Sequence, residues 1–173
     1  MSARDGDITP LSRDAGIRHG FRSERARILG QLAGVRNLIA LSGNIHANYA
    51  SHLHVDFDAP SATPVGCEFT VTGISSAPAH EQVQKLVDAS PLLNAFGLSK
   101  IVPEFDTNLR ATSPHITYAA SNTHGLALVE VDGDRELRVE FLEIDDVSAS
   151  SSFTAPRSRL FAVPSGSATI TPR

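Results

Sequence analysis

The strongest candidates for chemistry in this sequence are an asparagine and a histidine that follow an apolar run. The stretch LSGNIHANYA at residues 41–50 places Gly43, Asn44 and His46 where a predicted strand ends. A glycine turn lets the backbone approach a ligand, and ligands tend to bind beyond the carboxyl ends of strands in layered α/β architectures. An amide oxygen suits hard cations, and an imidazole nitrogen suits zinc or iron. The spacing therefore indicates either one wall of a metal site or a turn in which Asn44 caps its own backbone.

Two further pairs of histidines are weaker candidates. His52 and His54 alternate along a predicted strand, so both rings would share one face, as in a cupin-like metal site. The alternative is that this face is simply the polar, outer face of the strand. His115 and His124 flank another predicted strand, and spacing alone gives neither of them a catalytic partner.

The single cysteine and the missing motifs exclude several classes of enzyme. Cys67 lies in the apolar run PVGCEFTV, which indicates a small buried hydrophobic residue rather than a nucleophile. One cysteine also excludes an intrachain disulfide and a cysteine-based zinc cluster. The sequence has no P-loop, Gly-x-Ser-x-Gly elbow, His-Glu-x-x-His or Gly-x-Gly-x-x-Gly motif. This argues against a Walker-type NTPase, a serine hydrolase, a zincin and a Rossmann dehydrogenase.

Hydrophobic periodicity predicts the elements that must position these residues. Apolar residues at helical spacing predict helices within residues 23–34 and 79–90, with Ser23 as the N-cap of the first. Alternating residues predict an antiparallel hairpin over 48–57 and 65–74. The run 35–43 predicts a strand buried on both faces.

The rest of the chain predicts an α+β fold with mostly antiparallel strands. A meander follows at residues 115–144, and its Asp-Gly turn indicates a second hairpin. Residues 1–20 are polar and aperiodic and predict a flexible segment, whereas 21–145 form the body of the domain. The Ser- and Pro-rich residues 146–173 predict an extended or mobile tail.

Composition and charge limit the partners. Lys and Arg number 15 against 19 Asp and Glu, giving a formal charge of −4 in 173 residues. This balance weighs against a nucleic-acid surface, which needs a basic stripe. The sequence shows no membrane span and no apolar segment typical of a signal peptide, so as written the chain is expected to stay in the cytoplasm.

Four segments in order resemble the C-terminal portion of PhoD-like alkaline phosphatases, a branch of the metallophosphoesterases. The segments are ERARILGQL, NLIALSGNIHANYASHL, PVGCEFTVTGISS and SPHITYAASNTHGLALVEV. In the family pattern, a Ser-Gly-Asp-x-His segment follows a buried strand, and an Ile-Ser-Ser run and a Pro-His pair come later. The resemblance covers residues 14–145.

The resemblance implies a metal-dependent enzyme that hydrolyses phosphate monoesters and diesters. The implied fold is a two-sheet sandwich flanked by helices (αββα), with iron and calcium or other divalent ions in its site. Matching the pattern residue by residue makes Asn44 and His46 metal ligands, with His46 the catalytic position. His115, Ser75 and Ser76 match positions at the rim of the site.

This sequence departs from the family pattern in two ways. Asn44 stands where the pattern has Asp, which removes a negative charge from the site. The upstream metal-ligand motifs have no counterpart here, nor has the secretion signal of a family that is typically secreted or periplasmic. The chain is therefore expected to represent a truncated C-terminal part that is inactive alone and that needs a missing N-terminal half or a homodimer.

Two other interpretations stay open from the sequence. The first is a non-catalytic binding or remnant module of the same ancestry, which would use its exposed sheet. The second is a cupin-like metal protein built on His46, His52 and His54.

Overall fold

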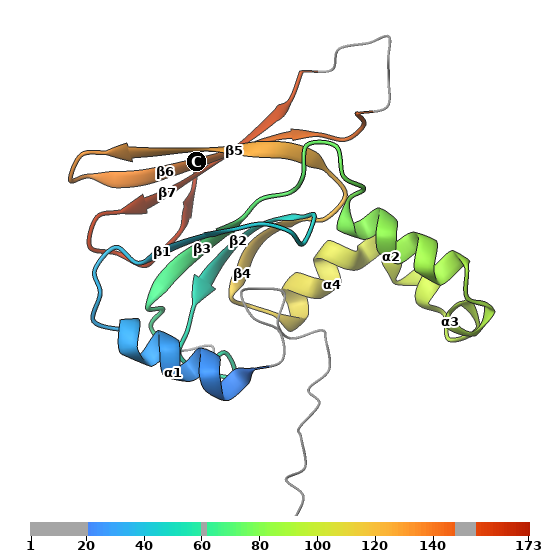
Figure 1. Ribbon diagram of the computed structural model, residues 1–173, viewed down its shortest axis with the longest axis horizontal. Helices are drawn as coiled ribbons and strands as arrows, with labels where there is room; N and C mark the ends of the chain where they lie inside the picture. Colours follow the sequence, from blue (N-terminus) through green and yellow to red (C-terminus); the bar gives the residue numbers. More distant parts are fainter. Residues whose placement is uncertain (1–20, 60–61, 148–154) are drawn as a thin grey trace, which may run out of the picture.

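Two four-stranded sheets form the centre of the part of the chain that the computed structural model describes, which is residues 21–59, 62–147 and 155–173. The first sheet has the order β1-β3-β2-β4 and the second the order β5-β6-β7-β8 (Figure 1). The strands are β1 (Ile39–Ser42), β2 (Asn48–Leu53), β3 (Gly66–Thr70), β4 (Ile116–Ala120), β5 (His124–Asp132), β6 (Glu136–Ile144), β7 (Arg157–Pro164) and β8 (Thr171–Pro172).

Strand pairing is antiparallel except between β1 and β3. The predicted hairpin is confirmed, because β2 and β3 pair antiparallel with Ala50 opposite Phe69. The Asp-Gly hairpin is also confirmed, since β5 and β6 pair along their whole length and Gly133 has a φ of 53°. The observed α+β class with antiparallel-rich sheets therefore agrees with the prediction.

The C-terminal segment is part of the second sheet. Residues 157–164 form β7, which pairs with β6, and the short β8 pairs with β7 in turn. The segment is extended, as predicted, but its ladder hydrogen bonds make it a structural strand rather than a mobile tail. Residues 1–20, predicted to be flexible, lie outside the described residues.

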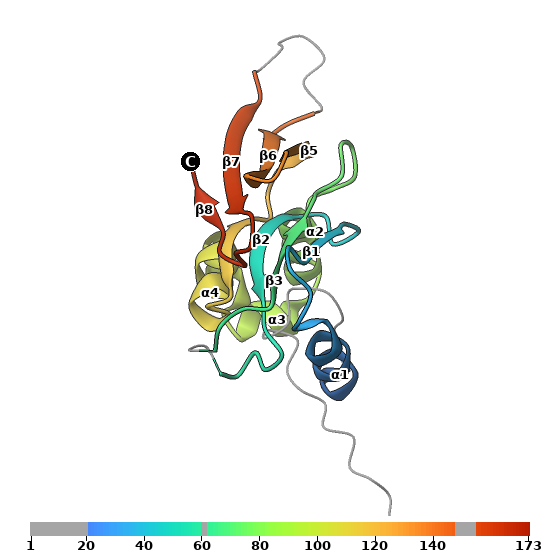
Figure 2. The same cartoon turned by 90° about the vertical axis from the view of Figure 1, so that its left-hand side faces the viewer.

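The helices lie on the side of the first sheet away from the second sheet (Figure 2). They are α1 (Arg22–Leu32), α2 (Ala79–Asp88), α3 (Pro91–Ala95) and α4 (Phe105–Thr112), with short 3-10 turns η2 (Leu98–Lys100) and η3 (Val102–Glu104) between the last two. Leu109 and Phe105 of α4 pack against Tyr49 and Ile116 of the sheet. The second outer helical layer of the αββα arrangement stays a prediction. None of the described helices is long and apolar enough to cross a membrane.

The main core lies between the two sheets. Phe69 of the first sheet meets Phe141 and Phe161 of the second, with ring centroids 6.3 and 6.2 Å apart. Cys67 lies in the same core, its thiol donates to the carbonyl of Ala168, and burial raises its pKa to about 12. The interpretation of Cys67 as a buried small residue is confirmed, because a thiol that stays protonated is no nucleophile.

Two predictions about burial in the first sheet are wrong. The run containing β1 was predicted to be buried on both faces, but β1 is an edge strand and Leu41 is 60% exposed. β2 was predicted to have one polar outer face, but both faces are buried. Ala50 faces the second sheet, whereas Tyr49 faces the helices, because the first sheet is the middle layer.

Candidate functional site

Three loops meet at one end of the first sheet. They are residues 43–47 after β1, 71–78 after β3, and 121–123 after β4. Backbone hydrogen bonds join them: Val71 N–H donates to the carbonyl of Ser42 at 2.9 Å, and Ala79 N–H donates to that of His46 at 2.9 Å. The third loop joins through Ser121, whose carbonyl accepts from His80 N–H at 3.0 Å. Asn44 and His46 therefore lie at a cluster of loops beyond strand ends, as their sequence position predicts.

The loop that carries these residues has an unusual backbone. Of the described non-glycine residues, three have a positive φ, and Asn44 at 71° and His46 at 60° are two of them. Asn and His enter this left-handed region more readily than most residues, but each still costs on the order of 1 kcal/mol. Strain of this kind persists only where surrounding contacts fix it, and such residues cluster at functional sites.

The ring of His46 is fixed by the loop that follows β3. His46 Nδ1 lies 2.8 Å from the carbonyl oxygen of Ala77, and the ring is half-buried. A carbonyl oxygen only accepts, so this contact is a hydrogen bond when Nδ1 carries the hydrogen, and in the neutral ring Nε2 then keeps its lone pair. This is the arrangement in which a backbone carbonyl orients a metal-binding or basic imidazole.

A buried polar network connects the loop of His46 and the loop after β3 to the second sheet. Asn48 accepts from Thr72 N–H at 2.8 Å and donates to Glu143 of β6 at 2.9 Å. Tyr118 OH also donates to the Glu143 carboxylate, at 2.8 and 2.9 Å. Burial and the nearby Glu143 raise the pKa of Tyr118 above its ordinary value, so it remains a donor. The network ties the His46 loop to the second sheet, two residues from His46 itself.

The donor set at this loop is small. Asn44 is exposed and offers a neutral amide oxygen, and His46 offers one neutral nitrogen. Among the residues that the structure describes, no group of three or more His, Cys, Asp or Glu side chains could hold a metal ion. Two neutral donors do not complete the six to eight ligands that calcium takes, so these residues fit a metal ion only as part of its coordination sphere.

The predicted rim residues divide between the two ends of the sheet. Ser75 and Ser76 are exposed in the loop that also supplies the Ala77 carbonyl, so they lie near His46 in the chain's fold. His115 precedes β4 at the opposite end, where its ring is buried against Phe57 with centroids 4.7 Å apart. His115 therefore does not line the loop cluster that holds Asn44 and His46.

The cupin-like grouping is not formed. His46 precedes β2, whereas His52 and His54 lie at its far end, with ring centroids 6.4 Å apart. His52 Nε2 accepts from Ile170 N–H at 3.2 Å, and His54 is 7% exposed. His52 therefore packs against the C-terminal hairpin and His54 against Phe57, and neither ring belongs to the loop cluster around His46.

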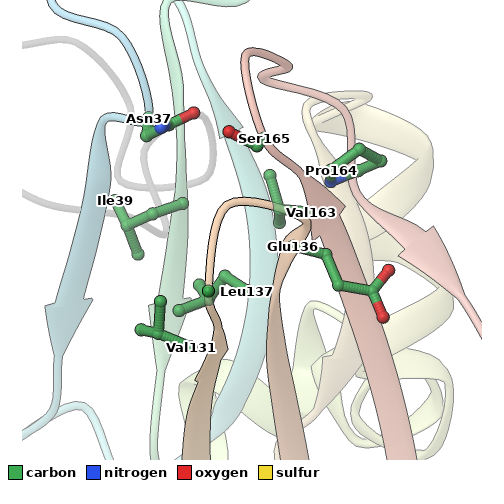
Figure 3. Close-up of a pocket in the computed structure, with 9 residues that line it drawn as sticks. Asn37, Ile39, Val131, Glu136, Leu137, Val163, Pro164 and Ser165 are labelled. Carbon is green, nitrogen blue, oxygen red and sulfur yellow. The ribbon is translucent and has the colours of Figure 1, made fainter.

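A cavity of about 280 Å³ lies away from the loop cluster. Ile39 at the start of β1 lines it with Val131, Leu137 and Val163 of the second sheet, as Figure 3 shows. The carboxylate of Glu136 points away from Ile39 in that view and is held by Arg138 and Arg173 at 2.8 and 2.6 Å. No Lys or Arg is among the described residues that line the cavity, so its lining offers no positive charge for a phosphoryl group.

Sequence reasoning missed the groups that hold the site together. The Ala77 carbonyl and the side chain of Gln82 both contact His46, from 31 and 36 residues away. Glu143 reaches Asn48 across 95 residues. No local spacing could have identified these contacts, because each depends on how separate elements pack.

Comparison with known proteins shows which family this chain resembles. A family model described as PhoD-like phosphatase matches residues 2–141. Alkaline phosphatase D of Bacillus subtilis (strain 168) is 37% identical over 59 residues, which are 33% of this chain and 10% of that protein. A solved structure of PhoD matches with a TM-score of 0.61 at 18% identity, over 88% of this chain and 26% of that chain.

These matches differ in what they establish. The chain spans only about a quarter of the solved PhoD chain, and the likeness at 18% identity shows the fold alone. The family model, in contrast, extends over most of the 173 residues and confirms the resemblance read from the four segments. This chain therefore belongs to the PhoD-like phosphatase family.

Proposed function

We propose that this chain contributes Asn44 and His46 to the metal site of a phosphoester hydrolase of the PhoD type, acting on phosphate monoesters and diesters. The observation that carries the proposal is the contact between His46 Nδ1 and the Ala77 carbonyl at 2.8 Å, which leaves Nε2 available. Membership of the PhoD-like family and the strained backbone at both residues support it.

Each residue has a defined task in this proposal. His46 Nε2 and the amide oxygen of Asn44 hold a metal ion, iron and calcium being the ions that the family resemblance suggests. When bound, such an ion neutralises phosphate charge and makes an attacking hydroxide available at neutral pH. The Ala77 carbonyl keeps the imidazole oriented, and the Asn48–Glu143 contact keeps the loop in place.

The proposal includes a dependence on further donors. Asn44 and His46 are two neutral ligands, so we expect the isolated chain to bind metal weakly and to hydrolyse phosphoesters at background rates. The remaining ligands would come from another part of a longer polypeptide, from a partner chain or from a second copy. The exposed apolar residues of the edge strand β5, such as Leu128 and Val131, are consistent with such a partner.

Calorimetric titration of the 173-residue chain with Ca²⁺, and anaerobically with Fe²⁺, tests the proposal. We expect a dissociation constant of about 10⁻³ M or weaker for Ca²⁺, typical of sites with few charged ligands. His46→Ala should abolish the binding of Fe²⁺. His80→Ala is the matched control, because the ring of His80 at the same end already donates to the Val102 carbonyl at 3.0 Å.

Hydrolysis of an aryl phosphate monoester and diester is measured in parallel. Activity that disappears in His46→Ala but persists in His80→Ala would mean that the chain alone builds a working site. Metal binding without hydrolysis would support the proposed partial site. Metal binding that is equal in His46→Ala and the unaltered chain would contradict the proposal.

A further inference from the structure

Three polar atoms form a tight triangle beside the loop cluster. His46 Nδ1 and Gln82 Nε2 each lie 2.8 Å from the Ala77 carbonyl oxygen, and they also lie 2.8 Å from each other. Three atoms this close cannot all form straight hydrogen bonds with one another. The assignment of hydrogens therefore decides what His46 can do.

Only one assignment leaves no repulsive contact with the carbonyl. A carbonyl oxygen has two lone pairs, so Ala77 can accept from both His46 Nδ1–H and the Gln82 amide. If Nδ1 instead accepted from Gln82, its lone pair would face the carbonyl oxygen at 2.8 Å. If the amide were reversed, two carbonyl oxygens would face each other at the same distance. The first assignment puts the hydrogen on Nδ1. Its one unfavourable contact is between two donors, Nδ1–H and the Gln82 amide, whose nitrogens lie 2.8 Å apart while both N–H groups point to the shared oxygen.

The start of α2 explains why Gln82 can reach this carbonyl. Ala77 directly precedes Pro78, the N-cap of α2, and Gln82 lies at the end of the first turn. Its N–H donates to the Pro78 carbonyl at 3.1 Å, while its side chain folds back to Ala77. The His46 carbonyl is fixed to the same helix end through Ala79 N–H. Loop and ring are thus attached to one rigid element.

We propose that Gln82 is a positioning residue, which holds the Ala77 carbonyl within hydrogen-bonding distance of Nδ1 and so keeps His46 in its Nδ1–H tautomer. Free histidine prefers the Nε2–H tautomer, so an Nε2 without hydrogen requires an interaction that stabilises the Nδ1–H tautomer. Without the Gln82 amide, the half-buried Ala77 carbonyl can turn to water and the ring can return to the form that has no free Nε2. The purpose of this interaction rests on the proposed function, but the tautomer itself does not.

Nitrogen NMR of the whole chain labelled with ¹⁵N-histidine tests this inference. Spectra are recorded without metal at alkaline pH, where histidines are neutral. His46→Ala identifies the signals of His46. We expect the unaltered chain to show hydrogen on Nδ1 and a bare Nε2. Gln82→Leu should lose this pattern and shift toward the Nε2–H form.

One further variant makes the result specific. Gln84→Leu is the matched control, because Gln84 is on the same helix and its side chain donates to Asp88, away from His46. It should leave the signals of His46 unchanged. The signals of the other histidines report whether each variant is folded.

The outcomes separate this inference from the proposed function. Hydrogen on Nε2 in the unaltered chain, or an unchanged Nδ1–H pattern in Gln82→Leu, would overturn the role of Gln82. A chain that shows the expected tautomers but binds no metal would retain the role of Gln82 and reject the metal site. Loss of metal binding in His46→Ala with no tautomer change in Gln82→Leu would retain the metal site and reject the role of Gln82.

Discussion

At the scale of single residues, Asn44 offers the site an amide oxygen but no negative charge. The Ser-Gly-Asp-x-His pattern that this stretch resembles would have Asp at this position, and the left-handed φ of 71° accepts either residue. An amide oxygen can still coordinate calcium, but it contributes no charge to attract the ion. A substitution that restores a negative charge at residue 44 should therefore raise the affinity of the site for a hard cation.

Asn44→Asp should raise the affinity for Ca²⁺ by about tenfold, because a carboxylate adds a negative charge without changing the backbone. Calorimetric titration with Ca²⁺ measures the change. Asn44→Gly is the control, since glycine keeps the left-handed conformation but removes the ligand, and it should lower the affinity. An equal affinity in Asn44→Asp and the unaltered chain would show that residue 44 does not face the ion.

At the scale of elements, Gly125 in the β5–β6 hairpin makes two backbone contacts. One is with β6 in the same sheet, and the other joins the second sheet to the loop after β3. Gly125 lies near the start of β5, and its N–H also contacts the Gly73 carbonyl of the loop after β3 at 3.3 Å. A Cβ at Gly125 would lie 2.0 Å from the backbone oxygen of Leu142. No side-chain rotation can relieve a contact with backbone, so this strand must have glycine here.

Gly125→Ala should lower the free energy of unfolding by about 1–3 kcal/mol, the usual cost of overpacking. Urea unfolding followed by circular dichroism measures it. Gly34→Ala is the control, because a Cβ there meets nothing within 4 Å, and its stability should stay close to that of the unaltered chain. Similar losses in both variants would argue against the backbone contact as the cause.

The elements also show where sequence reasoning succeeds. The helix at residues 79–88 and the two hairpins were predictable, because periodicity and the Asp-Gly turn are local features. The parallel pairing of β1 with β3 was not, since the partners are far apart in the chain. Strand β7 was missed because its polar first residues and Ser-rich surroundings conceal the apolar run that pairs with β6.

The site divides in the same way. The loop with Asn44 and His46 was predictable from residue types at a strand end, but its supports were not. That His115 lies at the opposite end of the sheet was not predictable, because a motif match gives no information on which end of the sheet a residue occupies. Packing, not spacing, decides which histidines share a site.

At the scale of the whole molecule, a histidine cluster joins α1, the first sheet and the C-terminal hairpin. His52 receives the N–H of Ile170, and the ring of Phe57 contacts both His54 and His115. The guanidinium of Arg25 lies 4.3 Å from the Phe57 ring centroid. Burial lowers the pKa of both His52 and His54, and each neighbouring positive charge would add to the cost of protonating them.

Stability should fall as the pH drops below about 6.5, the ordinary pKa of histidine. Below this pH, His52 and His54 bind protons in the unfolded chain but not in the folded chain. The difference persists until the pH falls below their lowered pKa values in the folded state. For each histidine, the slope should stay below about 1.4 kcal/mol per pH unit, the limit for one proton.

The urea midpoint at pH 7.5 and pH 5 measures this loss. His52→Asn keeps an acceptor for the Ile170 N–H but cannot titrate, so its midpoint should depend less on pH. The same pH dependence in His52→Asn and the unaltered chain would remove His52 as a cause.

The left-handed backbone at residue 44 has a consequence for how this protein can evolve. Codons for Asn and Asp differ by a single purine transition at the first base, and both residues tolerate this conformation. The charge that the family pattern places here can therefore be lost or regained in one mutational step, with no rearrangement of the loop in between. Substitution at residue 44 can therefore change the charge of the site without changing the backbone that carries it.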